Sequence, residues 1–233
     1  MWWITSWWWS NKIKYNEEIK KLVKLAYDNW INKFDSALVY GWWLWESIFH
    51  NLDFLDKLII STKIPAINKP ELSKVYTLEE IKTFYNYEYI EKSILCSIKK
   101  IWVESIDILY LHNWNKSWEK HFDYFSDIFK RLKEDWYVKN IWISLPDDYD
   151  WNFWWVKGLF VIDYIQLPHN LLNESILENT YSTFQRNWIK IVVRSIFLQW
   201  IILDPLKIHN LNNLDLRYKK YINNIDSINY LDN

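Results

Sequence analysis

Apolar residues recur along this chain in two alternating patterns, one with the period of a helix and one in short unbroken runs. Residues 16–29 place apolar side chains three and four positions apart, which is the spacing of one helix face. Residues 57–64 instead contain the run Leu58-Ile59-Ile60, which is typical of a strand buried on both faces of a parallel sheet. The same criteria predict helices over 16–29, 46–52, 87–101, 120–135 and 174–187, and strands over 31–37, 57–64, 105–112, 138–144, 161–167 and 189–195.

The regular order of strand and helix predicts a barrel. Repeated β/α units without a Gly-x-Gly-x-x-Gly motif favour a TIM barrel over a doubly wound sheet. With residues 4–6 as a first strand, seven strands are visible, and a short helix is expected near 151–158. Such a barrel usually needs about 250 residues. The expected fold class is therefore α/β, a TIM (β/α)8-type barrel incomplete at the eighth β/α unit, in a single domain over 1–233 with a divergent or truncated tail at 207–233.

Polar side chains stand where the predicted strands end. All strands of a parallel barrel end at the same rim, and that rim holds the active site of TIM-barrel enzymes. Each residue alone has a structural explanation, such as a loop cap, but the series along successive strands favours a site. The series is Asp35 with the nearby Tyr40, then Lys63, His112, Ser144, Gln166, Arg194 and Ser195.

Composition adds an anomaly, because the chain has 19 tryptophans and only 2 glycines. A chain of this length should contain about 16 glycines. Trp30, Trp136 and Trp188 share one setting, at the end of a predicted helix and before a predicted strand. That position often takes a left-handed backbone and then is usually glycine. We therefore hypothesise that most of the tryptophans are glycines, specified by UGA codons that the source organism reads as glycine.

The N-terminal tryptophans allow two interpretations. As written, Trp2-Trp3 and Trp7-Trp8-Trp9 would form an exposed aromatic patch, as at a membrane surface or a partner site. If they are glycines, the same positions form a glycine-rich loop after the first strand, where the backbone can approach a ligand closely. The second interpretation explains the positions better.

Charge, cysteine content and hydropathy narrow the class of protein. The net charge of −1 gives no electrostatic footprint for nucleic acid. The single cysteine, Cys96, allows no internal disulfide, and we expect it to be packed within the helix 87–101. No signal peptide opens the chain, and no run of about 18 apolar residues could span a membrane. We expect a soluble cytoplasmic protein that binds neither nucleic acid nor membrane, and the sequence leaves its oligomeric state open.

Three strand-end motifs resemble those of the aldo-keto reductases. They are Phe-Asp-Ser-Ala-x-x-Tyr-Gly at 34–41, Ile-Ile-Ser-Thr-Lys at 59–63 and Ile-Asp-Ile-Leu-Tyr-Leu-His at 106–112. The resemblance runs from about residue 2 to 205, and it improves when glycine replaces tryptophan in Lys-Lys-Ile-Trp-Val, Asn-Ile-Trp-Ile-Ser and Leu-Gln-Trp. The family's catalytic tetrad of Asp, Tyr, Lys and His matches Asp35, Tyr40, Lys63 and His112.

The resemblance implies an NAD(P)H-dependent oxidoreductase that reduces an aldehyde or ketone, or runs the reverse reaction, by hydride transfer. NADP is the expected cofactor, with NAD as the alternative, and the partner is a small-molecule carbonyl substrate; no residue is assigned to a metal. Tyr40 would give a proton to the carbonyl oxygen as general acid, Lys63 would favour its release, and Asp35 would hold Lys63 charged. His112 would donate a hydrogen bond that stabilises the developing charge.

The resemblance also implies a cofactor site. It assigns five residues to this site: Ser144 and Gln166 for the carboxamide, Ser195 for the pyrophosphate, and also Thr5 and Arg194. Leu145 stands where the family often has Asn, and Arg194 stands where it often has a stacking Tyr, although a planar guanidinium can stack instead. The segment 207–233 holds no basic cluster for a 2′-phosphate, so the residues do not decide between NADP and NAD.

Three other interpretations stay open at this point. A reductase-like protein could keep the cofactor site and serve a binding or regulatory role. A chain without the eighth unit could be an inactive truncated fragment, because an unclosed barrel leaves unpaired strand edges. A sugar-phosphate isomerase or aldolase on the same barrel could use Lys63 as a Schiff-base lysine, although Asp35 and Tyr40 favour the reductase.

Overall fold

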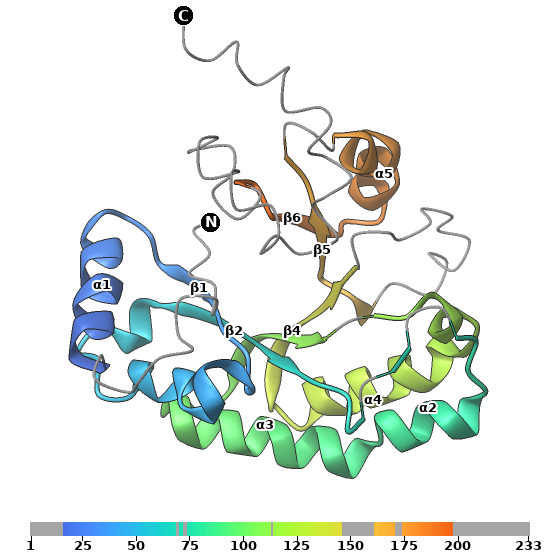
Figure 1. The fold of residues 1–233 in the computed structure, drawn as a ribbon, viewed down its shortest axis with the longest axis horizontal. Helices are drawn as coiled ribbons and strands as arrows, with labels where there is room; N and C mark the ends of the chain where they lie inside the picture. The colour runs from blue at the N-terminus through green and yellow to red at the C-terminus, as the bar shows by residue number, and fades with distance from the viewer. Residues whose placement is uncertain are drawn as a thin grey trace, which may run out of the picture.

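A parallel sheet of six strands, hydrogen-bonded in sequence order, forms the centre of the molecule (Figure 1). The structure is a computed structural model and describes residues 16–68, 70–71, 74–112, 114–145, 161–170 and 174–197. The strands are β1 (Lys33–Asp35), β2 (Ile59–Ile64), β3 (Ile106–Leu111), β4 (Val138–Ser144), β5 (Tyr164–Pro168) and β6 (Lys190–Arg194). The sheet curls like part of a barrel, which confirms the predicted fold class of an incomplete TIM-type barrel.

The helices lie along the outer side of the curled sheet (Figure 1). They are α1 (Asn16–Asp28), α2 (Leu78–Phe84), α3 (Tyr87–Ile101), α4 (Phe122–Glu134) and α5 (Ser175–Arg186), and short 3₁₀ helices occupy Tyr40–Trp43, Trp45–Phe49, Leu55–Lys57 and Lys116–His121. Among the described helices, none is both long enough and apolar enough to cross a membrane.

The packing of α4 shows how the sequence pattern produces the outer core. Phe125, Phe129 and Leu132 recur at helical spacing and are fully buried. They belong to one large apolar cluster that also contains Leu109 of β3 and Ile141 of β4. Burial of this stripe against the sheet therefore fixes α4 on the outer face.

The concave side of the sheet carries a smaller, separate cluster. Ile108, Tyr110, Trp142 and Val192 are buried together there. The rings of Tyr110 and Trp142 are stacked with centroids 4.1 Å apart, and Tyr164 stacks on the other side of Trp142 at 5.0 Å. Since neighbouring residues of a strand point to opposite faces, the side chains on this side are the ones available to a site inside the barrel.

The predicted elements agree with the structure to different degrees. The bounds of α3 and β4 were predicted without error, whereas β1 is shorter than the predicted strand 31–37. The expected helix 46–52 is instead the 3₁₀ helix Trp45–Phe49, and α2 was not predicted. The expected elements at 4–6 and 151–158 lie outside the described residues.

The prediction that Cys96 is a packed residue is wrong. This residue lies on α3, but its side chain faces solvent and is not packed. The buried face of α3 is made by residues such as Ile90, Ile94 and Ile101, and position 96 falls on the opposite side of that stripe.

The helix-to-strand junctions have the backbone that the sequence predicted. Trp30, Trp136 and Trp188 all have positive φ, and each follows the end of a helix. A fourth tryptophan, Trp102, stands in the same position after α3.

Candidate active site

The structure brings the predicted catalytic residues to one rim of the sheet. Asp35 is the last residue of β1, Lys63 lies near the end of β2, and His112 directly follows β3. Asp35 pairs with Ser61 in the register of β1 and β2, and Lys63 pairs with Tyr110 in the register of β2 and β3. Because the strands are parallel and adjacent, the three predicted side chains lie at the same end of the barrel.

A buried ion pair is the centre of this site. The Lys63 Nζ contacts Asp35 Oδ2 directly, and the two side chains are only 4% and 3% exposed. Lys63 Nζ also donates a hydrogen bond of 2.9 Å to the carbonyl oxygen of Ser36. The hydroxyl of Ser61 donates a 2.6 Å hydrogen bond to the other oxygen of Asp35, Oδ1. Each charge is therefore satisfied by the protein, as a buried charge requires.

The electrostatics keep Lys63 protonated. Burial alone would lower the pKa of the Lys63 ammonium, but the carboxylate of Asp35 and the hydroxyl of Tyr40 outweigh burial and raise it above its usual value. Asp35 depends on the same contact, because burial raises the pKa of its carboxyl and the Lys63 charge opposes that effect. Removal of either partner would thus leave a buried charge without its counter-ion.

Tyr40 lies beside this ammonium. It begins the 3₁₀ helix Tyr40–Trp43, and the following residue, Gly41, has a φ of 55°, a left-handed value that favours glycine. Lys63 Nζ is 5.1 Å from the centroid of the Tyr40 ring and 5.0 Å from that of Tyr110. The Lys63 ammonium thus lies close to the rings of two tyrosines.

His112 is held as a neutral imidazole. Its backbone N–H donates to the carbonyl of Ile64 at 3.1 Å, and its own carbonyl accepts a 3.0 Å hydrogen bond from the hydroxyl of Tyr85. Burial, together with the charges of Lys63 and Arg194, lowers the pKa of the His112 ring to about 4. A neutral imidazole has one N–H donor and one acceptor nitrogen, so near neutral pH His112 can donate a hydrogen bond without carrying charge.

Ser144 and Gln166 form a second buried polar pair on the next strands. Ser144 ends β4 and Gln166 lies in β5, and the two residues face each other in the register. The hydroxyl of Ser144 donates a 2.7 Å hydrogen bond to Gln166 Oε1, and both residues are buried. The Gln166 Nε2 donates to the hydroxyl of Tyr110 at 3.3 Å.

Tyr110 links the two halves of the site, and sequence reasoning missed it. Its hydroxyl also interacts with Asp35, so a chain of polar contacts runs from the Asp35–Lys63 pair through Tyr110 to Gln166. Burial, together with the nearby Asp35 carboxylate, raises the pKa of Tyr110 well above its usual value, so the hydroxyl keeps its proton. The signal in the sequence was the period of a strand, because Tyr110 lies two positions before His112.

Arg194 and Ser195 close the described part of the rim. Arg194 Nη2 donates a 2.8 Å hydrogen bond to the carbonyl of Leu145, and Nη1 lies 3.3 Å from the hydroxyl of Ser195. Ser195 has a φ of 59°, and its carbonyl accepts a 3.3 Å hydrogen bond from Asn170 Nδ2. Arg194 therefore ties the end of β6 to the end of β4. Thr5, the remaining predicted residue, lies outside the described residues.

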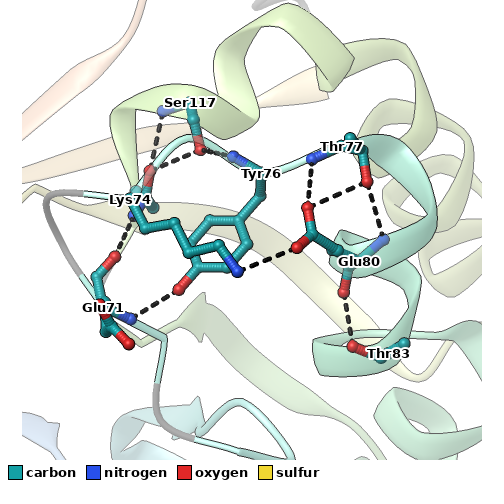
Figure 2. A network of polar contacts seen from close by, with 8 residues as sticks. Glu71, Lys74, Tyr76, Thr77, Glu80, Thr83 and Ser117 are labelled. Carbon is teal, nitrogen blue, oxygen red and sulfur yellow. Dashed lines mark hydrogen bonds and ion pairs between the residues drawn. The ribbon is translucent and has the colours of Figure 1, made fainter.

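The loops that follow β2 and β3 are joined by a polar network (Figure 2). Tyr76 accounts for two of its hydrogen bonds, since its N–H donates to Ser117 Oγ at 3.2 Å and its hydroxyl accepts from the Glu71 N–H at 2.7 Å. Asn115 Nδ2 donates to the carbonyl of Glu71 at 3.1 Å. Because these loops leave the strands that carry Lys63 and His112, the network steadies the rim around them.

Comparison with known proteins gives one family. The family model described as the aldo/keto reductase family matches residues 2–203 of this chain. The search among curated proteins gave no match.

Solved structures share the fold at low sequence identity. An aldo-keto reductase from Bacillus halodurans in its holo form is 18% identical with a TM-score of 0.63, and the match covers 80% of this chain and 60% of that one. A glycerol dehydrogenase from Gluconobacter oxydans is 17% identical with a TM-score of 0.64, covering 97% and 70%. An aldo/keto reductase from Klebsiella pneumoniae in complex with NADP and acetate is 10% identical with a TM-score of 0.62, covering 88% and 67%. The chain thus spans about 60% of the length of the first of these relatives.

Proposed function

The chain belongs to the aldo/keto reductase family, and from this premise we propose that it transfers a hydride between a nicotinamide cofactor and the carbonyl carbon of an aldehyde or ketone. The observation that carries the proposal is the buried Asp35–Lys63 pair beside Tyr40, with a neutral His112 at the same rim. A structural ion pair alone would not need a tyrosine and an uncharged histidine at the open end of the barrel.

Tyr40 acts as the general acid in this proposal. A carbonyl that accepts a hydride becomes an alkoxide and must take up a proton, which the Tyr40 hydroxyl supplies to the substrate oxygen. The Lys63 ammonium stabilises the phenolate left behind, because a nearby positive charge favours the deprotonated form. Asp35 keeps Lys63 charged and fixed, and Ser61 fixes Asp35.

His112 polarises the substrate in this proposal. Its neutral ring donates one N–H to the carbonyl oxygen and stabilises the charge that develops there. Because the pKa of the ring is about 4, His112 cannot compete with Tyr40 as the proton donor near neutral pH. The two residues therefore hold separate roles on the same oxygen atom.

The described residues fit a nicotinamide. The hydroxyl of Ser144 and the amide of Gln166 together offer the donors and acceptors that a carboxamide requires, and they lie on the two strands after the one that leads to His112. At the end of β6, Arg194 offers a planar guanidinium that stacks on the nicotinamide, and Ser195 offers a hydroxyl to the pyrophosphate. When bound, the reduced cofactor supplies the hydride, and the protein supplies orientation and charge. NADP is the proposed cofactor, supported by the Klebsiella pneumoniae enzyme solved with NADP, with NAD as the alternative.

Tyr110 is a positioning residue in this proposal. Its hydroxyl touches both the Asp35 carboxylate and the Gln166 amide, so it holds the cofactor-binding pair in register with the proton-donating group. Tyr110 affects the reaction only through its contacts with Asp35 and Gln166.

The test is a calorimetric titration of the protein with NADPH and with NADH, followed by turnover of a model aldehyde measured as loss of NADPH absorbance. We expect saturable binding of at least one cofactor and aldehyde-dependent oxidation. Binding without turnover would favour a regulatory reductase-like protein. Absence of binding at millimolar cofactor would remove the reductase assignment, and borohydride trapping of substrate on Lys63 would favour a Schiff-base enzyme instead.

A further inference from the structure

Four described helices end at a tryptophan with a left-handed backbone. The φ angles are 68° at Trp30, 72° at Trp102, 59° at Trp136 and 59° at Trp188. These residues follow α1, α3, α4 and α5 in turn. A positive φ is an outlier for any bulky residue, because the Cβ then crowds the following carbonyl oxygen.

The hydrogen bonds around Trp30, Trp136 and Trp188 are those of the Schellman motif, which ends many helices at a glycine. At the end of α1, the N–H of Ile31 donates to the carbonyl of Ala26 at 2.9 Å, and the N–H of Trp30 donates to that of Tyr27 at 3.0 Å. The ends of α4 and α5 repeat both bonds: Tyr137 to Leu132 and Trp136 to Lys133, then Ile189 to Phe184 and Trp188 to Gln185. The cap is therefore the same at the ends of α1, α4 and α5. At the end of α3 the N–H groups of Trp102 and Val103 both donate to the carbonyl of Ile98, at 2.9 and 3.2 Å, and the left-handed residue is again a tryptophan.

The indoles at these caps gain little that could offset the strain. The exposed fractions are 95% for Trp30, 65% for Trp102, 83% for Trp136 and 92% for Trp188. The indoles of Trp30, Trp136 and Trp188 bury almost no apolar area and so gain almost no stabilisation from packing. Trp102 is less exposed, and its ring packs edge to face on that of His50 with centroids 4.9 Å apart. The helix ends also face away from the rim that holds the proposed site, because each of them leads into the beginning of a strand.

A fifth tryptophan, Trp142, is unfavourable because it is buried, whereas the four at the helix caps are exposed. Trp142 lies in β4 on the concave side of the sheet and is fully buried. Its indole N–H has no hydrogen-bond partner among the described residues, although a buried indole N–H normally finds one. Its ring lies stacked between the rings of Tyr110 and Tyr164.

One cause accounts for both groups. We propose that positions 30, 102, 136, 142 and 188 are glycine in the protein that the source cell makes, because the gene specifies them with UGA codons that this cell reads as glycine. The codon UGA can exchange glycine for tryptophan in a translated sequence, because some translation systems read it as tryptophan and others as glycine. The 19 tryptophans and 2 glycines of the chain are the composition that such a substitution produces. The evidence is the backbone at the four helix caps and the burial of Trp142, and it is independent of the proposed function.

An exposed aromatic surface is the competing explanation. A docking surface would require indoles that are accessible, which these are, but it would not require each of them to occupy a left-handed helix cap. The cap geometry is explained by glycine and is unfavourable for tryptophan, so the glycine assignment explains more of the observations.

The direct test is mass spectrometry of peptides from the natural protein, together with the codons of the gene. We expect peptides that cover positions 30, 102, 136, 142 and 188 to be lighter by the difference between tryptophan and glycine, and we expect UGA at each position. UGG codons, or peptides that carry tryptophan there, would overturn the proposal.

A second test isolates the backbone effect. In a version with glycine at the other eighteen tryptophan positions, position 30 is made glycine, alanine or tryptophan, and the folding equilibrium constant is measured by urea unfolding. We expect glycine to exceed both others by about 5–30-fold, since alanine already carries the Cβ. Lys92→Gly, at an exposed site inside α3, is the matched control and should lower the constant. Equal constants for glycine and alanine at position 30 would overturn the argument from the backbone.

Discussion

Replacement of all 19 tryptophans by glycine should convert a strained chain into a stable one. In the version with tryptophan at all 19 positions, the four left-handed caps cost roughly 1–2 kcal/mol each and together lower the stability by about 4–8 kcal/mol. The unpartnered indole N–H of Trp142 adds about 1–3 kcal/mol. Typical domains have only about 5–15 kcal/mol of stability. We therefore expect the tryptophan version to be insoluble or molten, and the glycine version to show a near-UV circular dichroism spectrum and a cooperative guanidinium transition.

The control for this comparison carries alanine at positions 30, 102, 136 and 188 and glycine elsewhere. Alanine removes the indoles but keeps the Cβ, so this version should regain little of the 4–8 kcal/mol estimated roughly for the caps. If the tryptophan version unfolds cooperatively at the same denaturant concentration as the glycine version, the reasoning from backbone geometry is refuted.

Three further predictions concern the site. Lys63→Met should lower the free energy of unfolding, measured with urea, by about 3–5 kcal/mol, because Asp35 is left buried without its partner. Adding Asp35→Asn to this variant should restore most of the stability and none of the turnover. The pKa of His112 is about 4 in the folded protein, against an ordinary 6.5, so the unfolded state binds a proton more readily than the folded state. The stability due to this residue is therefore complete above about pH 6.5 and falls as the pH drops toward 4, by up to roughly 3 kcal/mol. His112→Gln should flatten that part of the stability-versus-pH curve, and an unchanged slope would contradict the assignment. Tyr110→Phe should weaken cofactor binding by about 2–10-fold in calorimetry, since Gln166 loses a hydrogen bond, while Tyr164→Phe, on the far side of the same ring stack, should not.

The fold could be predicted to the extent that local pattern and tertiary packing agree. α3 begins at the Asn86 cap and keeps one apolar face to Ile101, so its bounds were visible in the sequence. α2 was missed because it has seven residues and buries only Ile81; its signal was the capping box between Thr77 and Glu80. β1 is shorter than the predicted strand 31–37 because regular pairing with β2 extends only from Lys33 to Asp35.

The site was predictable where polar residues interrupt an apolar strand at its end, and less so within the strand. Asp35, Lys63 and His112 were found in this way, and the structure places them at one rim. Ser61 and Tyr110 were not found, because a small hydroxyl and an aromatic ring inside a strand look like core residues. Their roles depend on the register between strands, which sets Ser61 beside Asp35 and Tyr110 beside Lys63 and which no local pattern specifies.

Turnover of the Tyr40→Phe variant is the measurement that tests the proposed reductase most directly. The substitution removes the hydroxyl but keeps the ring that lies 5.1 Å from Lys63 Nζ, so the fold and the cofactor site should be preserved. We expect kcat to fall by roughly 10²–10⁴-fold while the calorimetric Kd for the cofactor stays nearly unchanged, because the proton is transferred only in the chemical step. A variant that binds cofactor and retains nearly full turnover would show that another group donates the proton, and Tyr40 would not be the general acid.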